Sequence, residues 1–133
     1  MQSTLSNKEV GNIMKSLAAL MELHEENPFK IKSYANAAFQ LSRIPDVVME
    51  MDRTTMEQTK GIGKSVAAKL VELRETGDIE ALRKLLDMTP AGIIDMLQIK
   101  GLGAKKVRVI WKELGVEDVG ELLYACYENR LAK

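Results

Sequence analysis

Two glycine turns carry the residue types best suited to bind phosphate. The motif Lys-Gly-Ile-Gly at 60–63 returns as Lys-Gly-Leu-Gly at 100–103, and a helix-forming run follows each copy. A turn that enters a helix leaves backbone N–H groups free at the positive end of the helix dipole. Because glycine has no Cβ, a nucleic-acid backbone can come close to those groups. Two such turns in one short chain predict a ligand with regularly repeated phosphates, and DNA fits that description.

The expected contacts are the N–H groups around the glycines and the charges of the lysines that follow them. These residues are Gly61, Gly63, Lys64, Gly101, Gly103, Lys105 and Lys106. Phosphate contacts position a protein on DNA but carry little sequence information. We therefore expect binding that does not depend on the DNA sequence.

A dinucleotide-binding or phosphate-loop motif does not account for these turns. The dinucleotide fingerprint needs a third glycine, where this chain has Val66 and Lys106, and it follows a strand rather than a helix. The phosphate-loop pattern Gly-x-x-x-x-Gly-Lys-Ser/Thr does not occur in the sequence. The alternative that remains is a pair of helical corners that bind no ligand.

The charges are unevenly distributed, although they sum to zero. The segment 100–112 has five basic residues and no acidic one, and the segment 28–45 also has basic residues but no acid. Segregation of this kind can give a neutral protein one basic face. The alternative is a set of solvated helix surfaces of both signs.

The first part of the chain predicts two long helices. Aromatic residues make up only 5%, helix-forming residues are abundant, and we find no strand with period-two alternation. A capping-box pattern at Ser6 and Glu9 opens one periodic helix, and Asn27-Pro28 opens a second that runs to about Leu41. We expect the second helix to bury its apolar stripe, which consists of Ile31, Ala35, Ala38 and Phe39.

The rest of the chain predicts the pattern of short helix, glycine turn and longer helix, twice. Thr54 or Thr55 is expected to cap the first short helix, and Gly77 to end the long one. A helix at 78–86 follows, Thr89-Pro90 opens the next short helix, and a helix at 104–114 follows the second turn. A last helix is expected from Asp118. The predicted fold is an all-α helical bundle with two helix-hairpin-helix motifs.

Single cysteine and histidine residues limit the available chemistry. Because Cys126 is the only cysteine, no disulfide can form within the chain, and one cysteine with one histidine cannot build a zinc cluster. We expect His24 to lie at the surface and Trp111 to pack in the core rather than stack on a base. No apolar run is long enough to span a membrane. A cytoplasmic location, no membrane partner and a monomeric state are the expectations.

Several motifs together resemble a known family. They are Asn-Pro-Phe-Lys-Ile-Lys-Ser-Tyr at 27–34, Gly-Ile-Gly-Lys at 61–64, Leu-Arg-Glu-Thr-Gly at 73–77, Gly-Leu-Gly-Ala-Lys-Lys at 101–106 and Lys-Glu-Leu-Gly-Val at 112–116. The chain resembles the amino-terminal portion of the family X DNA polymerases, the group that includes DNA polymerase beta, and looks closest to the bacterial branch. The resemblance covers nearly the whole chain.

The resemblance implies a division of the chain and a larger parent protein. Residues 1–87 correspond to a lyase-type helical domain with the first hairpin, and residues 88–133 to a second DNA-binding hairpin subdomain that is truncated at its C-terminus. The polymerase carboxylates of this family bind two Mg²⁺ ions in a palm domain, which this chain is too short to contain. We therefore expect the N-terminal fragment of a DNA repair polymerase, with Mg²⁺ only in the missing domain.

The resemblance also implies how the hairpins work. In such enzymes they hold the two sides of a gapped duplex that carries a 5′ phosphate, and hairpin carbonyls coordinate a monovalent cation that bridges to DNA. No other cofactor is required. The positions that correspond here, for Na⁺ or K⁺, are the carbonyls of Glu57, Thr59, Ile62, Leu97, Ile99 and Leu102.

One chemical activity is implied by position. Family members with lyase activity use a lysine to form a Schiff base with the sugar aldehyde at an incised abasic site, and Lys69 matches that lysine. Lys30, Lys32 and Lys64 are expected to bind the 5′ phosphate there, and Tyr34 matches a tyrosine that helps to shape this pocket. The chain departs from the active pattern by Phe29 in place of a histidine and by Ser65 and Glu57 in place of lysines. The alternative for Lys69 is a surface lysine that pairs with Glu72 or Glu25.

Three functions follow from these observations. The first is sequence-independent binding of gapped or nicked duplex DNA through its phosphate backbone. The second is a 5′-deoxyribose-phosphate lyase that uses Lys69 as the nucleophile. The third is a helical scaffold that binds proteins and not DNA, which would show no salt-dependent affinity for DNA.

Overall fold

Every regular element in the described part of the chain is a helix. The computed structural model describes residues 5–99, 101–115, 117 and 120. In chain order the elements are α1 (Asn7–Leu23), α2 (Pro28–Leu41), the 3-10 turn η1 (Val48–Glu50), α3 (Arg53–Gln58), α4 (Gly63–Thr76), α5 (Glu80–Asp87), α6 (Ala91–Leu97), α7 (Ala104–Arg108) and the π-helical turn η2 (Val109–Glu113). The all-α prediction is confirmed.

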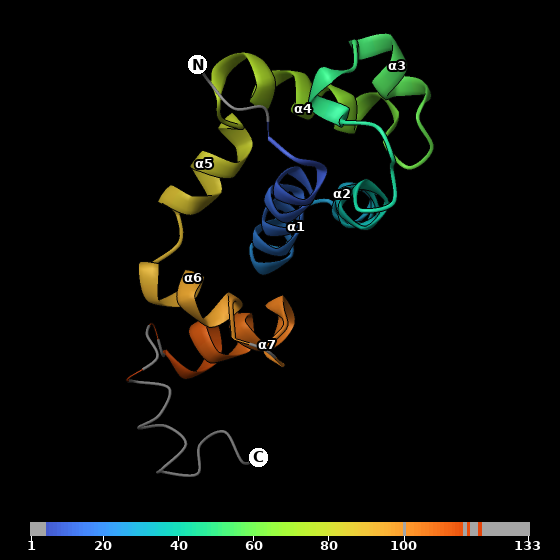
Figure 1. The fold of residues 1–133 in the computed structure, drawn as a ribbon. Coiled ribbons are helices and arrows are strands. Elements are labelled where there is room, and N and C mark those ends of the chain that lie inside the picture. Colours follow the sequence, from blue (N-terminus) through green and yellow to red (C-terminus); the bar gives the residue numbers. More distant parts are fainter. Residues whose placement is uncertain (1–4, 100, 116, 118–119, 121–133) are drawn as a thin grey trace.

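Helix α1 lies at the centre of the molecule, beside α2 (Figure 1). The predicted capping box is present, since the Ser6 hydroxyl accepts a hydrogen bond from the Glu9 amide and the Glu9 carboxylate accepts one from the Ser6 amide. The buried face of α1 includes Met14 and Leu17 and packs against α2, α5 and α7. Because α7 belongs to the second hairpin unit, α1 holds that unit beside α2 and α5.

The predicted core face of α2 is only partly correct, because Ile31 and Ala38 are half-buried against the core but the other two predicted residues are not. The buried residues of this helix are Tyr34, Ala37 and Leu41, whereas Phe39 is 54% exposed and Ala35 is also exposed. Tyr34, Ala37 and Leu41 form a second stripe with helical spacing, so periodicity alone does not distinguish the two faces. Tyr34 is a suitable core residue because its hydroxyl has a partner inside the protein, the Ser65 hydroxyl at 3.2 Å.

The first hairpin unit consists of α3, the turn and α4. Its short helix is capped by Asp52 rather than by Thr54 or Thr55, and the backbone amide of Thr55 donates to the Asp52 carboxylate at 2.7 Å. This hydrogen bond holds the pKa of Asp52 below its usual range. Helix α4 ends at Gly77, which has a φ of +79°, as predicted.

The second hairpin unit consists of α6, the turn, α7 and η2. The helix predicted over 104–114 is present, but from Val109 it changes to the wider π-helical spacing. Val107 and Ile110 are buried and Trp111 packs against the core, as expected from their spacing. The helix predicted from Asp118, with Cys126, lies outside the described residues.

His24 joins the second unit to the end of α1, which contradicts its predicted surface position. Its Nε2 lies 2.8 Å from the hydroxyl of the buried Thr89, and its ring meets the Trp111 ring edge-on at 5.7 Å. Because the Thr89 hydroxyl donates its single proton to the Leu85 carbonyl, His24 Nε2 is the donor in the pair. Beside it, Arg108 pairs with Glu25 at 3.3 Å. The end of α1 therefore holds the second hairpin in place.

This junction is expected to make stability depend on pH. Burial and then the charge of Lys112 lower the pKa of His24 in the folded protein below its ordinary value of 6.5. The unfolded chain therefore binds more protons between the two pKa values, so the free energy of unfolding falls as pH is lowered through 6.5. Since His24 is the only histidine, the effect is assigned to one residue. Urea unfolding between pH 7.5 and 5.5 measures it.

His24→Gln is the matched control, because its amide can still donate to Thr89 but does not titrate in this range. We expect that variant to lose the pH dependence. An unchanged pH dependence in His24→Gln would mean that another group causes it.

Candidate nucleic-acid interface

The two glycine turns have the same hydrogen-bonding pattern. In the first, the Thr59 amide donates to the Met56 carbonyl and the Ile62 amide to the Thr59 carbonyl, both at 3.1 Å. In the second, Ile99 and Leu102 donate in the same way, to Met96 and Ile99. The first glycine of each turn also has nearly the same backbone angle, with φ of +90° at Gly61 and +93° at Gly101. The sequence repeat is thus a structural repeat.

The second glycines differ between the turns. Gly63 has a φ of +69° and is the first residue of α4, whereas Gly103 has an extended backbone (φ −80°, ψ 168°) and caps α7. A left-handed backbone favours glycine at 63, but the extended backbone at 103 is open to any residue. The backbone angles therefore do not explain why position 103 is a glycine.

The two turns also differ in how open they are. A Cβ on Gly61 would lie 2.4 Å from Cγ of Gln40, so α2 covers this glycine closely. A Cβ on Gly101 or on Gly103 would meet nothing within 4 Å. The second turn therefore leaves free space for a phosphate beside its backbone, and the first turn is partly covered at Gly61.

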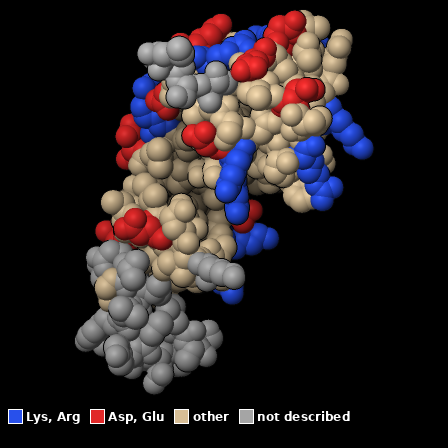
Figure 2. All heavy atoms as spheres, viewed as in Figure 1, with Lys and Arg blue, Asp and Glu red and all other residues tan. Residues whose placement is uncertain are grey.

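Basic side chains lie at both turns. Lys64 is exposed at the start of α4, and Lys105 and Lys106 are exposed on α7. On the face drawn in Figure 2, lysine and arginine side chains cross the middle and the right of the molecule, while most acidic side chains in view lie toward the top and left. At the top and left of the same face, basic side chains also lie beside the acidic ones, so the charges in this view are only partly segregated.

The structure brings three of the predicted lyase residues to one pocket. Lys30 and Tyr34 of α2 and Lys69 of α4 line a hollow of about 610 Å³. Three carboxylates, of Glu26, Glu72 and Glu80, and one more lysine, Lys84, line the same hollow. Lys32 and Lys64 are not among its lining residues. Its lysines and glutamates balance, so the pocket is not strongly basic.

The predicted ion pairs of Lys69 are absent. Glu25 pairs with Arg108 instead, and the Glu72 carboxylate accepts a hydrogen bond from the Glu80 amide at 2.7 Å. Within the described residues no carboxylate lies within 4.0 Å of the Lys69 amine. Both acids interact with residues of another helix, and these interactions could not be predicted from the spacing of the acids in the sequence.

Binding of a cation by the hairpin carbonyls remains a prediction. Thr59 and Ile99 each accept one hydrogen bond inside the turn, and a carbonyl oxygen has a second lone pair. In the residues that the structure describes, no three His, Cys, Asp or Glu side chains come together as a metal site. Nor does that part of the chain include a helix both long and apolar enough to cross a membrane.

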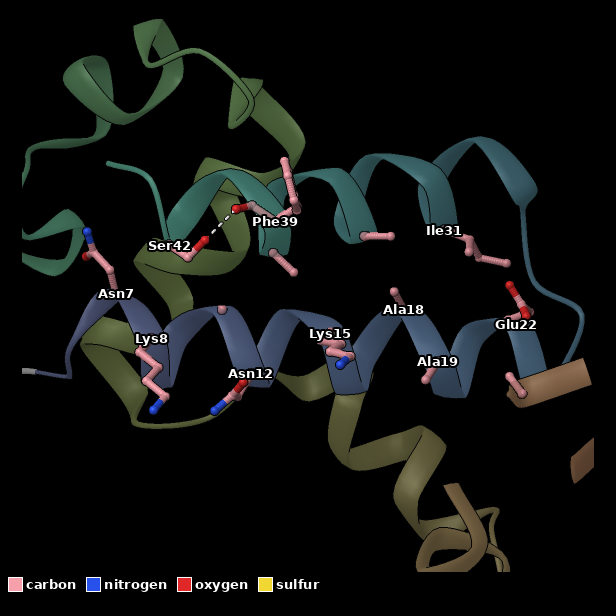
Figure 3. Close-up of a pocket in the computed structure, with 14 residues that line it drawn as sticks. Asn7, Lys8, Asn12, Lys15, Ala18, Ala19, Glu22, Ile31, Phe39 and Ser42 are labelled. Carbon is pink, nitrogen blue, oxygen red and sulfur yellow. Dashed lines mark hydrogen bonds between the residues drawn. The ribbon is translucent and has the colours of Figure 1, made fainter. Parts of the chain in front are cut away.

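Two further hollows adjoin the exposed face of α1, and sequence reasoning missed them. One, of about 490 Å³, runs between α1 and α2 and is lined by Lys8, Phe39 and several alanines (Figure 3). The other, of about 910 Å³, lies between α1 and the second hairpin and includes Gly101 and Gly103. Lys15 lines both. The sequence indicates a polar face of α1 that carries Lys8, Asn12 and Lys15. It does not indicate that this face lies beside the second hairpin, because that depends on the tertiary fold.

Comparison with known proteins places the chain in a family. Residues 5–79, more than half of the chain, match the model of a helix-hairpin-helix domain. The chain is also 32% identical over 127 residues to the DNA polymerase/3′-5′ exonuclease PolX of Bacillus subtilis (strain 168), a match that covers 96% of this chain and 22% of the relative. The chain thus spans about a fifth of that protein, in its N-terminal part, which confirms the resemblance to family X polymerases. It belongs to the helix-hairpin-helix domain family.

Proposed function

We propose that this chain binds gapped or nicked duplex DNA through the phosphate backbone, without reading its sequence. The observation that carries the proposal is the repeated turn, which in its second copy leaves Gly101 and Gly103 open to a phosphate. The neighbouring Lys105 and Lys106 are exposed and add positive charge. The family match and the similarity to a DNA polymerase support DNA as the ligand.

Salt dependence tests this proposal. A labelled duplex with a one-nucleotide gap and a 5′ phosphate should bind, and the logarithm of its affinity should fall linearly with the logarithm of salt concentration. With roughly three to five phosphates neutralised, the slope is about −3 to −5. An intact duplex of the same length is the control and should bind more weakly. No binding at low salt, or a flat salt response, would favour a protein-binding scaffold.

Within a longer protein, this region would hold DNA for a polymerase. The similarity to the N-terminal part of PolX supports such a role, since the name of that relative describes a polymerase and exonuclease. The catalytic Mg²⁺ would then be bound outside this chain. A Na⁺ or K⁺ ion at the turn carbonyls would bridge to DNA phosphates, and replacing K⁺ by a bulky organic cation would weaken binding.

A 5′-deoxyribose-phosphate lyase is the second candidate function. The observation that favours it is the shared pocket of Lys30, Tyr34 and Lys69. Lys69 would attack the sugar aldehyde, release water and form a Schiff base. Glu26, Glu72 and Glu80 in the same pocket oppose a 5′ phosphate, so we expect slow chemistry.

A further inference from the structure

We infer that the exposed face of α1 binds a single DNA strand that continues from the second hairpin toward the groove between α1 and α2. The inference rests on the proposed function and names residues that the glycine motifs do not include. They are Lys8, Asn12 and Lys15, with Ala19 between the two hollows.

Continuity between the hollows is the first argument. Asn12, Lys15, Ala19 and Ala104 line both of them, so the hollows meet along one side of α1. Figure 3 shows Lys8, Asn12, Lys15 and Ala19 along α1, Ala18 turned toward α2, and Ile31 and Phe39 on α2. At 1.5 Å rise per residue, Lys8 and Lys15 stand roughly 10 Å apart along the helix. A strand that leaves the second turn therefore meets Lys15 first and Lys8 next.

Charge is the second argument. In the described residues no Asp or Glu lines the hollow beside the second hairpin, and Glu22 is the one acid that lines the groove between α1 and α2. Lys8 and Lys15 are exposed, and neither forms an ion pair within the described part of the chain. The lyase-type pocket, in contrast, is lined by equal numbers of lysines and glutamates. An anionic ligand is favoured on α1 and not in that pocket.

The shape of the groove suits a strand with unpaired bases. Its floor is made by small side chains such as Ala18, Ala35 and Ala38, which leave room for sugars and bases. Phe39 is 54% exposed at its wall, and the Arg43 guanidinium lies over one face of its ring, 4.4 Å from the ring centre, so a base would stack on the other face. An exposed aromatic ring beside cations is a platform on which bases of any sequence stack. This accounts for an aromatic side chain that α2 leaves outside the core.

Charge reversal at Ala19 tests the inference. Ala19→Glu places a carboxylate where the two hollows meet, and Ala19→Gln adds a side chain of the same size without the charge. With a duplex that carries a single-stranded extension, we expect about tenfold weaker binding for Ala19→Glu and less than about twofold for Ala19→Gln. A blunt duplex should show little difference between the two variants.

Lysine substitutions give a second readout. Lys15→Gln should reduce the salt slope on the extended DNA by about 0.7, the value for one phosphate contact on a single strand. Arg83→Gln is the matched control, because Arg83 lines neither hollow and pairs with Asp78 at the surface. Its slope should not change.

The outcomes separate this inference from the proposed function. If Lys105→Gln weakens binding while Lys15→Gln and Ala19→Glu behave like Arg83→Gln, the hairpin proposal stands and the α1 strand path is wrong. If Ala19→Gln weakens binding as much as Ala19→Glu, shape rather than charge governs the groove, as for a protein segment, and the inference is also overturned. If the wild-type chain binds no DNA, both the proposed function and the α1 strand path are wrong.

Discussion

Replacing Gly103 by valine is expected to weaken binding to gapped duplex DNA about tenfold. The fold should tolerate the change, because Gly103 has an extended backbone and a Cβ there meets no atom within 4 Å. The valine side chain would instead fill the space through which a phosphate reaches the turn. A tenfold loss corresponds to roughly 1.4 kcal/mol, about the value of one hydrogen bond to a charged group. Fluorescence anisotropy measures the affinity, and circular dichroism checks the helices.

A graded series makes this test specific. Gly103→Ala adds a smaller side chain and should lose less affinity than Gly103→Val, while loss of the glycine N-cap of α7 should lower thermal stability slightly and by a similar amount in both. The equivalent change at Gly61 would not separate folding from binding, since its left-handed backbone and the contact with Gln40 both oppose a side chain. Wild-type affinity in Gly103→Val would show that the second turn is only a helical corner.

Local signals in the sequence predicted the helices and turns well. Ser6, Asn27 and Gly77 act through hydrogen bonds and backbone angles of their immediate neighbours, and each lies where it was expected. The repeat of the two turns was predictable for the same reason. Two helix starts differed by about two residues. Asp52 caps α3 because it lies two residues before Thr54 and has a similar capping ability, and α5 begins at Glu80 rather than at residue 78.

Features that depend on packing between helices could not be predicted in this way. Phe39 and Tyr34 lie on two apolar stripes of one helix, and only the position of α1 and α4 decides which stripe is buried. His24 meets Thr89 across 65 residues of sequence, and this contact is one of those that hold the second hairpin unit against the end of α1. Lys15 and Gly101 line one hollow because of that placement, so no sequence motif could predict the hollow.

In the pocket lined by Lys30, Tyr34 and Lys69, the lysines were predictable from the sequence and the neighbouring acids were not. Position in a family motif identified Lys69, and the structure brings it together with Lys30 and Tyr34. The motif did not predict that Glu26 and Glu80 would line the same space, because they come from the loop between α1 and α2 and from the start of α5. These acids lower the positive field that would attract a 5′ phosphate.

Lys69→Ala is expected to abolish nearly all covalent trapping of the chain on a 5′-incised abasic duplex. In the presence of borohydride, a Schiff base between the Lys69 amine and the sugar aldehyde is reduced to a stable secondary amine, which denaturing gel electrophoresis detects as a slower band. We expect weak trapping by the wild-type chain, since three glutamates share the pocket with its lysines.

Lys84→Ala is the matched control for this test. Lys84 lines the same pocket but pairs with Glu80 at 3.4 Å, so its removal should leave the adduct largely intact. Lys64→Ala should also have the smaller effect, because Lys64 is exposed at the start of α4 and does not line the pocket. Strong trapping in Lys69→Ala would show that a different amine reacts. If the wild-type chain binds the incised DNA but gives no adduct, it is a binding module without the lyase step, because the DNA is held and Lys69 does not react.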